Sequence, residues 1–153
     1  MTSFPAASQP RPFTFVGSDH GPWSVVSARV LAGAALSPAR CLTVLAGEAD
    51  APPPGMGWAL AGITSNDRYV ERPEKSALAG VQASLGRPEA TRAALMPIRQ
   101  SPAWWALTQD ERRAVFEEQS HHIAVGLRYL PAVARRLHHC RDLGPNELFD
   151  FLA

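Results

Sequence analysis

The stretch of sequence that decides the fold covers residues 101–152, SPAWWALTQDERRAVFEEQSHHIAVGLRYLPAVARRLHHCRDLGPNELFDFL. Its clearest element is a predicted helix that begins at Thr108 and runs to Leu130. Thr108, followed three residues later by Glu111, forms a capping box, which stabilises the start of a helix by about 1 kcal/mol. Pro131 cannot continue a helix, because it lacks the backbone N–H, and therefore predicts where this one ends.

One face of this predicted helix is apolar. At about 100° per residue, that side carries Phe116, Gln119, Ile123, Leu127 and Leu130, with Val115 and Gly126 at its edge. His122 lies on the same edge, whereas His121 points toward the polar face. The pattern therefore predicts an amphipathic helix with one histidine at the border of its apolar face.

The segment after Pro131 has two interpretations. Residues 132–140 can form a second helix, but they also alternate, with Val133, Arg135, Leu137 and His139 on one face. We favour a strand, because a Gly-Pro-Asn turn at 144–146 and strand-like residues at 148–152 would complete a hairpin. Strand, helix, strand, strand is the order that opens a ferredoxin-like unit. Such a unit ends with another helix and strand, and we expect both to be missing, since the sequence stops at residue 153.

The first ninety residues predict a smaller half that is rich in strands. We expect strands at 13–17, 23–30, 42–45 and 58–64, a surface loop at 49–57, a helix at 74–85 and a further strand at 91–99. The fold class is therefore α+β. We expect a loose arm at 1–11 and a single domain at 12–153, made of a reduced N-terminal half (12–90) and an incomplete C-terminal half (91–153).

Composition narrows the function. The chain has 153 residues, 46% of them hydrophobic, which is enough for one domain with a core. Its net charge is +1 and its arginines are matched by acids, which argues against nucleic-acid or anionic-membrane partners. Neither a secretion signal nor an apolar run of about 20 residues is present, and Cys41 and Cys140 form no Cys-x-x-Cys pair. We therefore expect a cytoplasmic protein without a membrane partner.

His122 and Arg135 are the candidate functional residues. A neutral imidazole at the edge of an apolar face suits an axial haem ligand, and Gly126 one turn later would let a flat ligand approach. An unbroken helix would separate His122 and Arg135 by roughly 20 Å, but a chain that turns back after Pro131 lets them face each other across a cofactor. The plainer alternatives are a histidine bonded to a backbone carbonyl and an arginine on a solvated strand edge.

Two other features carry less chemistry. His138, His139 and Cys140 are disfavoured as a zinc site, because consecutive strand residues point to opposite faces. The spacing of Trp104 and Trp105 indicates core or interface aromatics and no more than that.

Three segments resemble the chlorite dismutase family, in particular its short-subunit, dimeric branch. They are GITSNDRYV at 62–70, LGRPEAT at 85–91, and the run from Trp104 to Asp142. The last is the most specific, because the helix, the Tyr129-Leu130-Pro131 stop and the RRLHHCRD run at 135–142 match in order and spacing. The resemblance extends from about residue 58 to residue 152.

The resemblance implies a ferredoxin-like, dimeric α+β barrel whose C-terminal half (91–153) holds haem b. His122 would be the axial iron ligand and Arg135 the distal catalytic residue, with Trp104, Tyr69 and Ile98 lining the pocket. The implied enzyme is a chlorite O2-lyase that converts chlorite to chloride and dioxygen. Its implied partners are the small anion chlorite and a second copy of the chain.

The sequence departs from the family pattern at two points. Gln100 stands where the family usually has a lysine near the haem propionates, which would weaken charge pairing with the cofactor. The carboxylate that normally accepts a hydrogen bond from the axial histidine is expected beyond residue 153. The alternative function is therefore a non-catalytic or truncated haem-binding relative with little chlorite turnover. Coprohaem decarboxylases fit less well, because they usually lack the arginine that Arg135 supplies.

Overall fold

The chain divides into two units near Thr64, each of which is described by itself. The computed structural model describes residues 11–47, 55–144 and 148–153. Residues 11–64 and 142–144 of this range belong to the first unit, and residues 65–141 and 148–153 belong to the second. The predicted arm at 1–11 and the predicted loop at 49–57 lie mostly outside the described residues. The division into halves at residue 90 stays a prediction.

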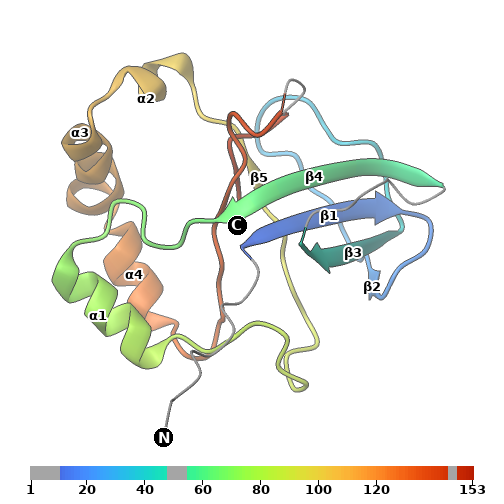
Figure 1. Cartoon of the computed structure of the whole chain (residues 1–153), viewed down its shortest axis with the longest axis horizontal. Helices are drawn as coiled ribbons and strands as arrows, with labels where there is room; N and C mark the ends of the chain where they lie inside the picture. Colours follow the sequence, from blue (N-terminus) through green and yellow to red (C-terminus); the bar gives the residue numbers. More distant parts are fainter. Residues whose placement is uncertain (1–10, 48–54, 145–147) are drawn as a thin grey trace, which may run out of the picture. The chain divides into compact units, whose positions relative to one another are not determined.

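Four antiparallel strands form the first unit (Figure 1). Strand β1 (Pro12–Ser18) pairs with β3 (Cys41–Ala46) on one side and with β4 (Met56–Thr64) on the other, and β2 (Trp23–Ser24) pairs with β3. Phe15 of β1 lies opposite Val44 and Leu60 in these two neighbours. Because β1 is central, four consecutive residues, 14–17, are buried.

Three of the strands predicted for this unit are confirmed, and the fourth was too long. Strand β2 ends at Ser24, and its register explains why: Ser24 lies opposite Cys41, where β3 begins. Residues 25–30 therefore extend past the end of their partner strand and are exposed, Val26 to 95%. Their β-branched side chains favour a strand, but strand propensity needs a neighbour to pair with.

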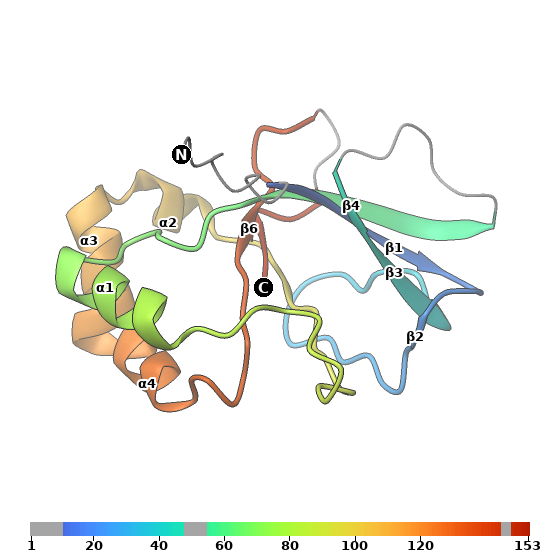
Figure 2. The same cartoon turned by 60° about the horizontal axis from the view of Figure 1, so that its bottom comes forward.

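The second unit contains all the helices of the described chain. They are α1 (Arg72–Val81), α2 (Pro102–Ala106), α3 (Gln109–Arg113), the π-helical segment η1 (Ala114–Gln119) and α4 (His122–Arg128). In two views, α1 and α4 lie side by side (Figures 1 and 2). The unit's core is made of Leu78, Trp104, Ile123, Cys140, Phe151 and Leu152, together with buried Arg112 and His138.

Three short antiparallel strands complete this unit. Strand β7 (Phe151–Leu152) pairs with β6 (His138–His139) and with β5 (Pro97–Ile98). The predicted hairpin after Pro131 is thus confirmed as a pairing, although its strands are far shorter than 132–140 and 148–152. The strand predicted at 91–99 is wrong except at 97–98, where two backbone hydrogen bonds between Met96 and Ala153 extend the ladder by one step.

Helix α1 starts and ends earlier than the predicted 74–85. Glu71 and Glu74 form a capping box that begins the helix before Pro73. Gln82 leaves it in extended conformation, and its side-chain amide donates to the backbone carbonyl of Arg135 at 3.0 Å. Helix α2 was not predicted, although Ser101 caps it through the N–H of Trp104 and a proline follows the cap.

The helix predicted from 108 to 130 is broken. Its capping box at Thr108 and its end before Pro131 are confirmed, but the backbone leaves the helix at His121, where φ is 52°. The hydroxyl of Ser120 donates to the carbonyls of Val115 and Phe116, at 2.9 and 2.7 Å, at the end of η1. A hydroxyl that competes for helix carbonyls is a known way to weaken or bend a helix.

Candidate functional site

His122 is the first residue of α4, and its side chain is exposed. Its ring meets the ring of Phe116 edge to face, with 5.2 Å between centroids. Partial loss of water around the ring lowers the pKa of His122; the positive charge of Arg135 lowers it further, and Glu117 opposes both. The imidazole is therefore neutral at pH 7, which leaves a ring nitrogen free to bind a metal.

Arg135 comes to the same helix from the segment after Pro131. A Cβ atom at Gly126 would lie 2.3 Å from Nη1 and 3.0 Å from Cζ of Arg135, so the guanidinium rests on the one residue of this turn without a side chain. Gln82 holds the Arg135 backbone from α1. The chain thus brings His122 and Arg135 together.

Phe116 also packs against an aromatic cluster formed with Tyr69 and Trp104. Tyr69 stacks on Phe116 at 5.2 Å, and Trp104 meets both rings edge to face, at 6.0 and 5.4 Å. The hydroxyl of Tyr69 and the indole N–H of Trp104 are buried, and neither has a hydrogen-bond partner among the described residues. Buried polar atoms normally have partners, so these two donors are candidates for contact with a bound ligand.

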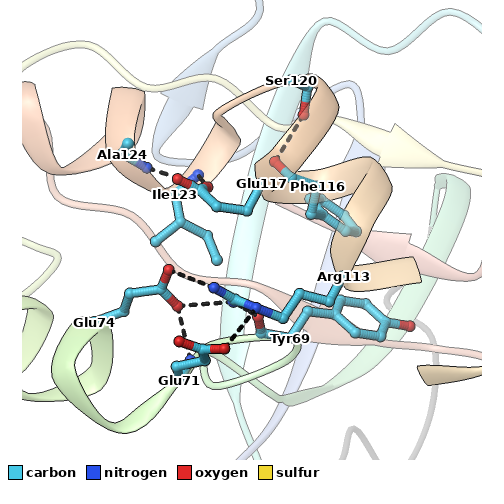
Figure 3. Close-up of polar contacts among 9 residues, drawn as sticks. All are labelled: Tyr69, Glu71, Glu74, Arg113, Phe116, Glu117, Ser120, Ile123 and Ala124. Atoms are coloured by element: carbon cyan, nitrogen blue, oxygen red, sulfur yellow. Dashed lines mark hydrogen bonds and ion pairs between the residues drawn. The ribbon is translucent and has the colours of Figure 1, made fainter. Parts of the chain in front are cut away.

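Arg113 fixes the backbone at Tyr69 (Figure 3). Its guanidinium donates to both carboxylate oxygens of Glu74, at 2.8 and 2.9 Å, and to the carbonyl of Tyr69, and it pairs with Glu71 at 3.3 Å. The hydrogen bonds from Arg113 hold the pKa of Glu74 below its usual value. Tyr69 has φ of 61°, which non-glycine residues adopt only where the surroundings enforce it. The contacts of Arg113 hold the Tyr69 backbone in this conformation and so fix the orientation of the Tyr69 ring.

Arg112 fixes Trp104 in a similar way. It is buried, and it donates through Nε to the carbonyl of Trp104 (3.1 Å) and through Nη2 to that of Trp105 (2.7 Å). These carbonyls lie in the last turn of α2, where that of Trp104 also accepts the N–H of Leu107 at 3.2 Å. Two neighbouring arginines of α3 therefore position Tyr69 and Trp104, the two aromatic residues predicted for the pocket.

The remaining predicted residues lie elsewhere in the second unit. Ile98 belongs to β5, opposite Phe151 of β7. The backbone N–H of Gln100 donates to the carboxylate of Asp150 at 2.7 Å. Within the part of the chain that the structure describes, no three His, Cys, Asp or Glu side chains converge as a metal site would require.

Three residues of the site were not predicted: Arg113, Phe116 and Glu117. On an ideal helix, six residues rotate the chain by about 240°, which would separate Phe116 from His122. The π-helical segment and the break at His121 remove that restriction. No simple sequence signal predicts the π-helical segment or the break at His121.

No protein-family model and no curated protein sequence matches the chain. Among solved structures, it is similar to a dimeric chlorite dismutase from Nitrobacter winogradskyi, known from its crystal structure, at 54% sequence identity and a TM-score of 0.81. The match covers 92% of this chain and 77% of the other. The chain belongs to the chlorite dismutase family.

Membership of the chlorite dismutase family confirms two predictions. The ferredoxin-like α+β fold is confirmed, since antiparallel strands and helices of this chain superpose on those of a family member. The class of enzyme, a haem oxidoreductase of the chlorite dismutase type, is also confirmed. Among the described residues, no helix has the length and apolar character needed to cross a membrane.

Replacing Gly126 with alanine is expected to push the Arg135 guanidinium off α4. Alanine favours a helix interior by up to about 1 kcal/mol over glycine, and the clashing atom is the mobile end of a side chain. We expect the free energy of unfolding to rise by that amount, and the pKa of His122 to rise as the positive charge moves away. Urea unfolding and a proton NMR titration measure the two effects; an unchanged His122 pKa would contradict the contact.

Proposed function

We propose that this member of the chlorite dismutase family is a haem b enzyme that converts chlorite to chloride and dioxygen, with His122 as axial iron ligand and Arg135 as catalytic residue. The observation that carries the proposal is the proximity of His122 and Arg135. A neutral imidazole and a permanent cation meet on α4 beside a glycine, in a chain 54% identical to a chlorite dismutase.

The residues around His122 fit a haem group. Imidazole nitrogen is a usual axial ligand of haem iron. The Tyr69 hydroxyl and the Trp104 indole N–H are unpaired donors that suit haem carboxylates, and Gly126 leaves the helix surface flat. A planar group between His122 and Arg135 requires the guanidinium to leave Gly126, which a long flexible side chain can do. Ile98, the fifth proposed pocket residue, would add apolar lining.

Haem, when bound, supplies an iron centre that takes part in breaking the Cl–O bonds of chlorite. The overall conversion of one chlorite ion to one chloride and one dioxygen balances in atoms and charge, so it needs no external reductant. What the protein must add is a means to hold an anion in place and to retain the chlorine-containing fragment until oxygen has formed.

Arg135 is suited to that task. A guanidinium stays charged at any pH that the protein encounters, and its fork of N–H donors can contact two oxygens of a small anion. Charge placed beforehand where an anion develops is among the largest single contributions to catalysis. The half-buried position of Arg135 strengthens this attraction relative to bulk water.

Tyr69 and Trp104 would serve the cofactor rather than the substrate. Their rings, aligned by Arg113 and Arg112, would offer apolar contact to a porphyrin edge, and their polar atoms have no hydrogen-bond partner among the described residues. We further propose that residues 91–153 hold the cofactor, that residues 12–90 form a supporting half of the same domain, and that the chain works as a homodimer in the cytoplasm. The homodimer proposal is supported by the similarity to a dimeric enzyme.

Oxygen release tests the proposed function. Chain loaded with one equivalent of haem b should release dioxygen from chlorite at an oxygen electrode, with one chloride formed per chlorite consumed. Free haem at the same concentration is the control. Haem-loaded chain that releases no dioxygen would contradict the proposal and would favour a haem-binding relative without chlorite turnover.

A further inference from the structure

Helix α4 begins without a capping side chain of its own. The first N–H groups of any helix lack partners within the helix, and the residue before the helix usually supplies one. In α4 that residue is His121, whose side chain makes no capping hydrogen bond and whose backbone is left-handed. The start of the helix that carries His122 must therefore be held by something else.

Glu117, which precedes the break at His121, caps the start of α4. Its Oε2 atom accepts hydrogen bonds from the N–H of Ile123 at 2.9 Å and of Ala124 at 3.4 Å (Figure 3). These are the second and third residues of α4, the positions that a capping side chain normally serves. Negative charge at this end of a helix is also favourable.

The neighbour of Glu117 touches His122 directly. Phe116 packs its ring edge to face on the imidazole, while Glu117 binds the two amides that follow His122. Two consecutive residues of η1 thus hold the ring and the backbone of the same residue. Rotation of α4 about the break at His121 would disturb both contacts at once.

We propose that Glu117 is a positioning residue for His122: by binding the amides of Ile123 and Ala124 it sets the orientation of the imidazole toward the iron. This inference rests on the proposed function, because it takes His122 as the iron ligand. Glu118, the next residue, is exposed and serves as a matched control of the same chemistry.

Hydrogen exchange tests the contact without any cofactor. In the haem-free chain, Glu117→Ala should speed amide exchange at Ile123 and Ala124 by about tenfold, the loss expected when a helix cap is removed. Glu117→Gln, which keeps an acceptor oxygen, should speed it less, and Glu118→Ala should leave it unchanged. If the alanine variant does not fold, Glu117→Met keeps the length and removes both oxygens. Equal exchange in the Glu117→Ala and Glu118→Ala chains would overturn the proposal.

Spectroscopy of the haem-loaded chain tests the role toward iron. In Glu117→Ala, the iron–imidazole stretching band of the ferrous protein should shift or broaden, and haem should leave about tenfold faster, a usual effect of losing a group that orients an iron ligand. Glu117→Gln should restore most of the wild-type behaviour. Identical bands in every variant, with haem bound through His122, would refute the positioning role. Wild-type chain that binds no haem through His122 would instead refute the proposed function, whatever the exchange rates show.

Discussion

Arg135→Ala is expected to lower kcat/KM for chlorite by about two orders of magnitude, a loss on the order of 3 kcal/mol, while haem stays bound. The guanidinium is the permanent cation that lies on α4 beside His122, and its charge is large enough to lower the pKa of that histidine. Removing it takes away the group that holds the anionic substrate. Dioxygen release, measured at equal haem content by the Soret absorbance, gives the comparison.

Arg135→Lys separates charge from geometry. Lysine keeps the positive charge but loses the planar fork, so we expect activity between those of the wild type and the alanine variant. Arg136→Ala, at the adjacent position, should leave kcat/KM close to that of the wild type. An alanine variant at position 135 that turns over chlorite at the wild-type rate would remove Arg135 from the mechanism.

Acidification from pH 7 to pH 4 is expected to destabilise the chain by an amount on the order of 3 kcal/mol through His138 alone. Burial, reinforced by the positive charge of Arg136, lowers the pKa of His138 from 6.5 to about 4. The unfolded chain therefore binds a proton below pH 6.5 that the folded chain does not yet bind. The stability that neutral His138 provides is complete above pH 6.5 and is lost as the pH falls toward 4.

Urea unfolding between pH 7 and pH 4 measures this loss. Carboxylates such as Glu74, whose pKa is also lowered, add their own dependence, so the informative quantity is the difference between wild type and His138→Gln. The variant should lose less stability than the wild type over this range. His20→Gln, at an exposed position, is the control and should follow the wild type. Parallel curves for the wild type and His138→Gln would contradict the assignment.

The sequence predicts those parts of the fold that depend on neighbouring residues. The capping box at Thr108 and the stop at Pro131 act within one helical turn, and both are found where expected. The break at His121 could not be predicted from periodicity, because apolar residues continue at helical spacing through Ile123 and Leu127. It depends on where the side chains of Glu117 and Ser120 find partners, which only the folded chain shows.

The predicted length of β2 was wrong for a related reason. Residues 25–30 have the composition of a strand, but β3 begins at Cys41, and the pairing goes one step further, from the N–H of Val25 to the carbonyl of Arg40 at 2.8 Å. Pairing between strands is a property of two segments, and a pattern within one of them cannot fix its end.

Only part of the candidate site could be predicted from the sequence. The apolar face marked His122, and the stop at Pro131 allowed Arg135 to return to it, as the contact with Gly126 shows. Tyr69 and Trp104 came from the resemblance to the family, since neither has a local signal. Phe116 packs on both Tyr69 and His122, but the sequence placed it only on the apolar face of the predicted helix. The irregular turn before His121, which brings it to the imidazole, was not predicted.

Haem titration of the purified chain, followed by absorbance, tests whether His122 binds haem iron. We expect a Soret band that saturates at one haem per chain, is lost in His122→Ala, and persists in His121→Ala, the variant of the neighbouring histidine that serves as control. A chain without a saturable band, or a His122→Ala variant that binds haem as the wild type does, would contradict it.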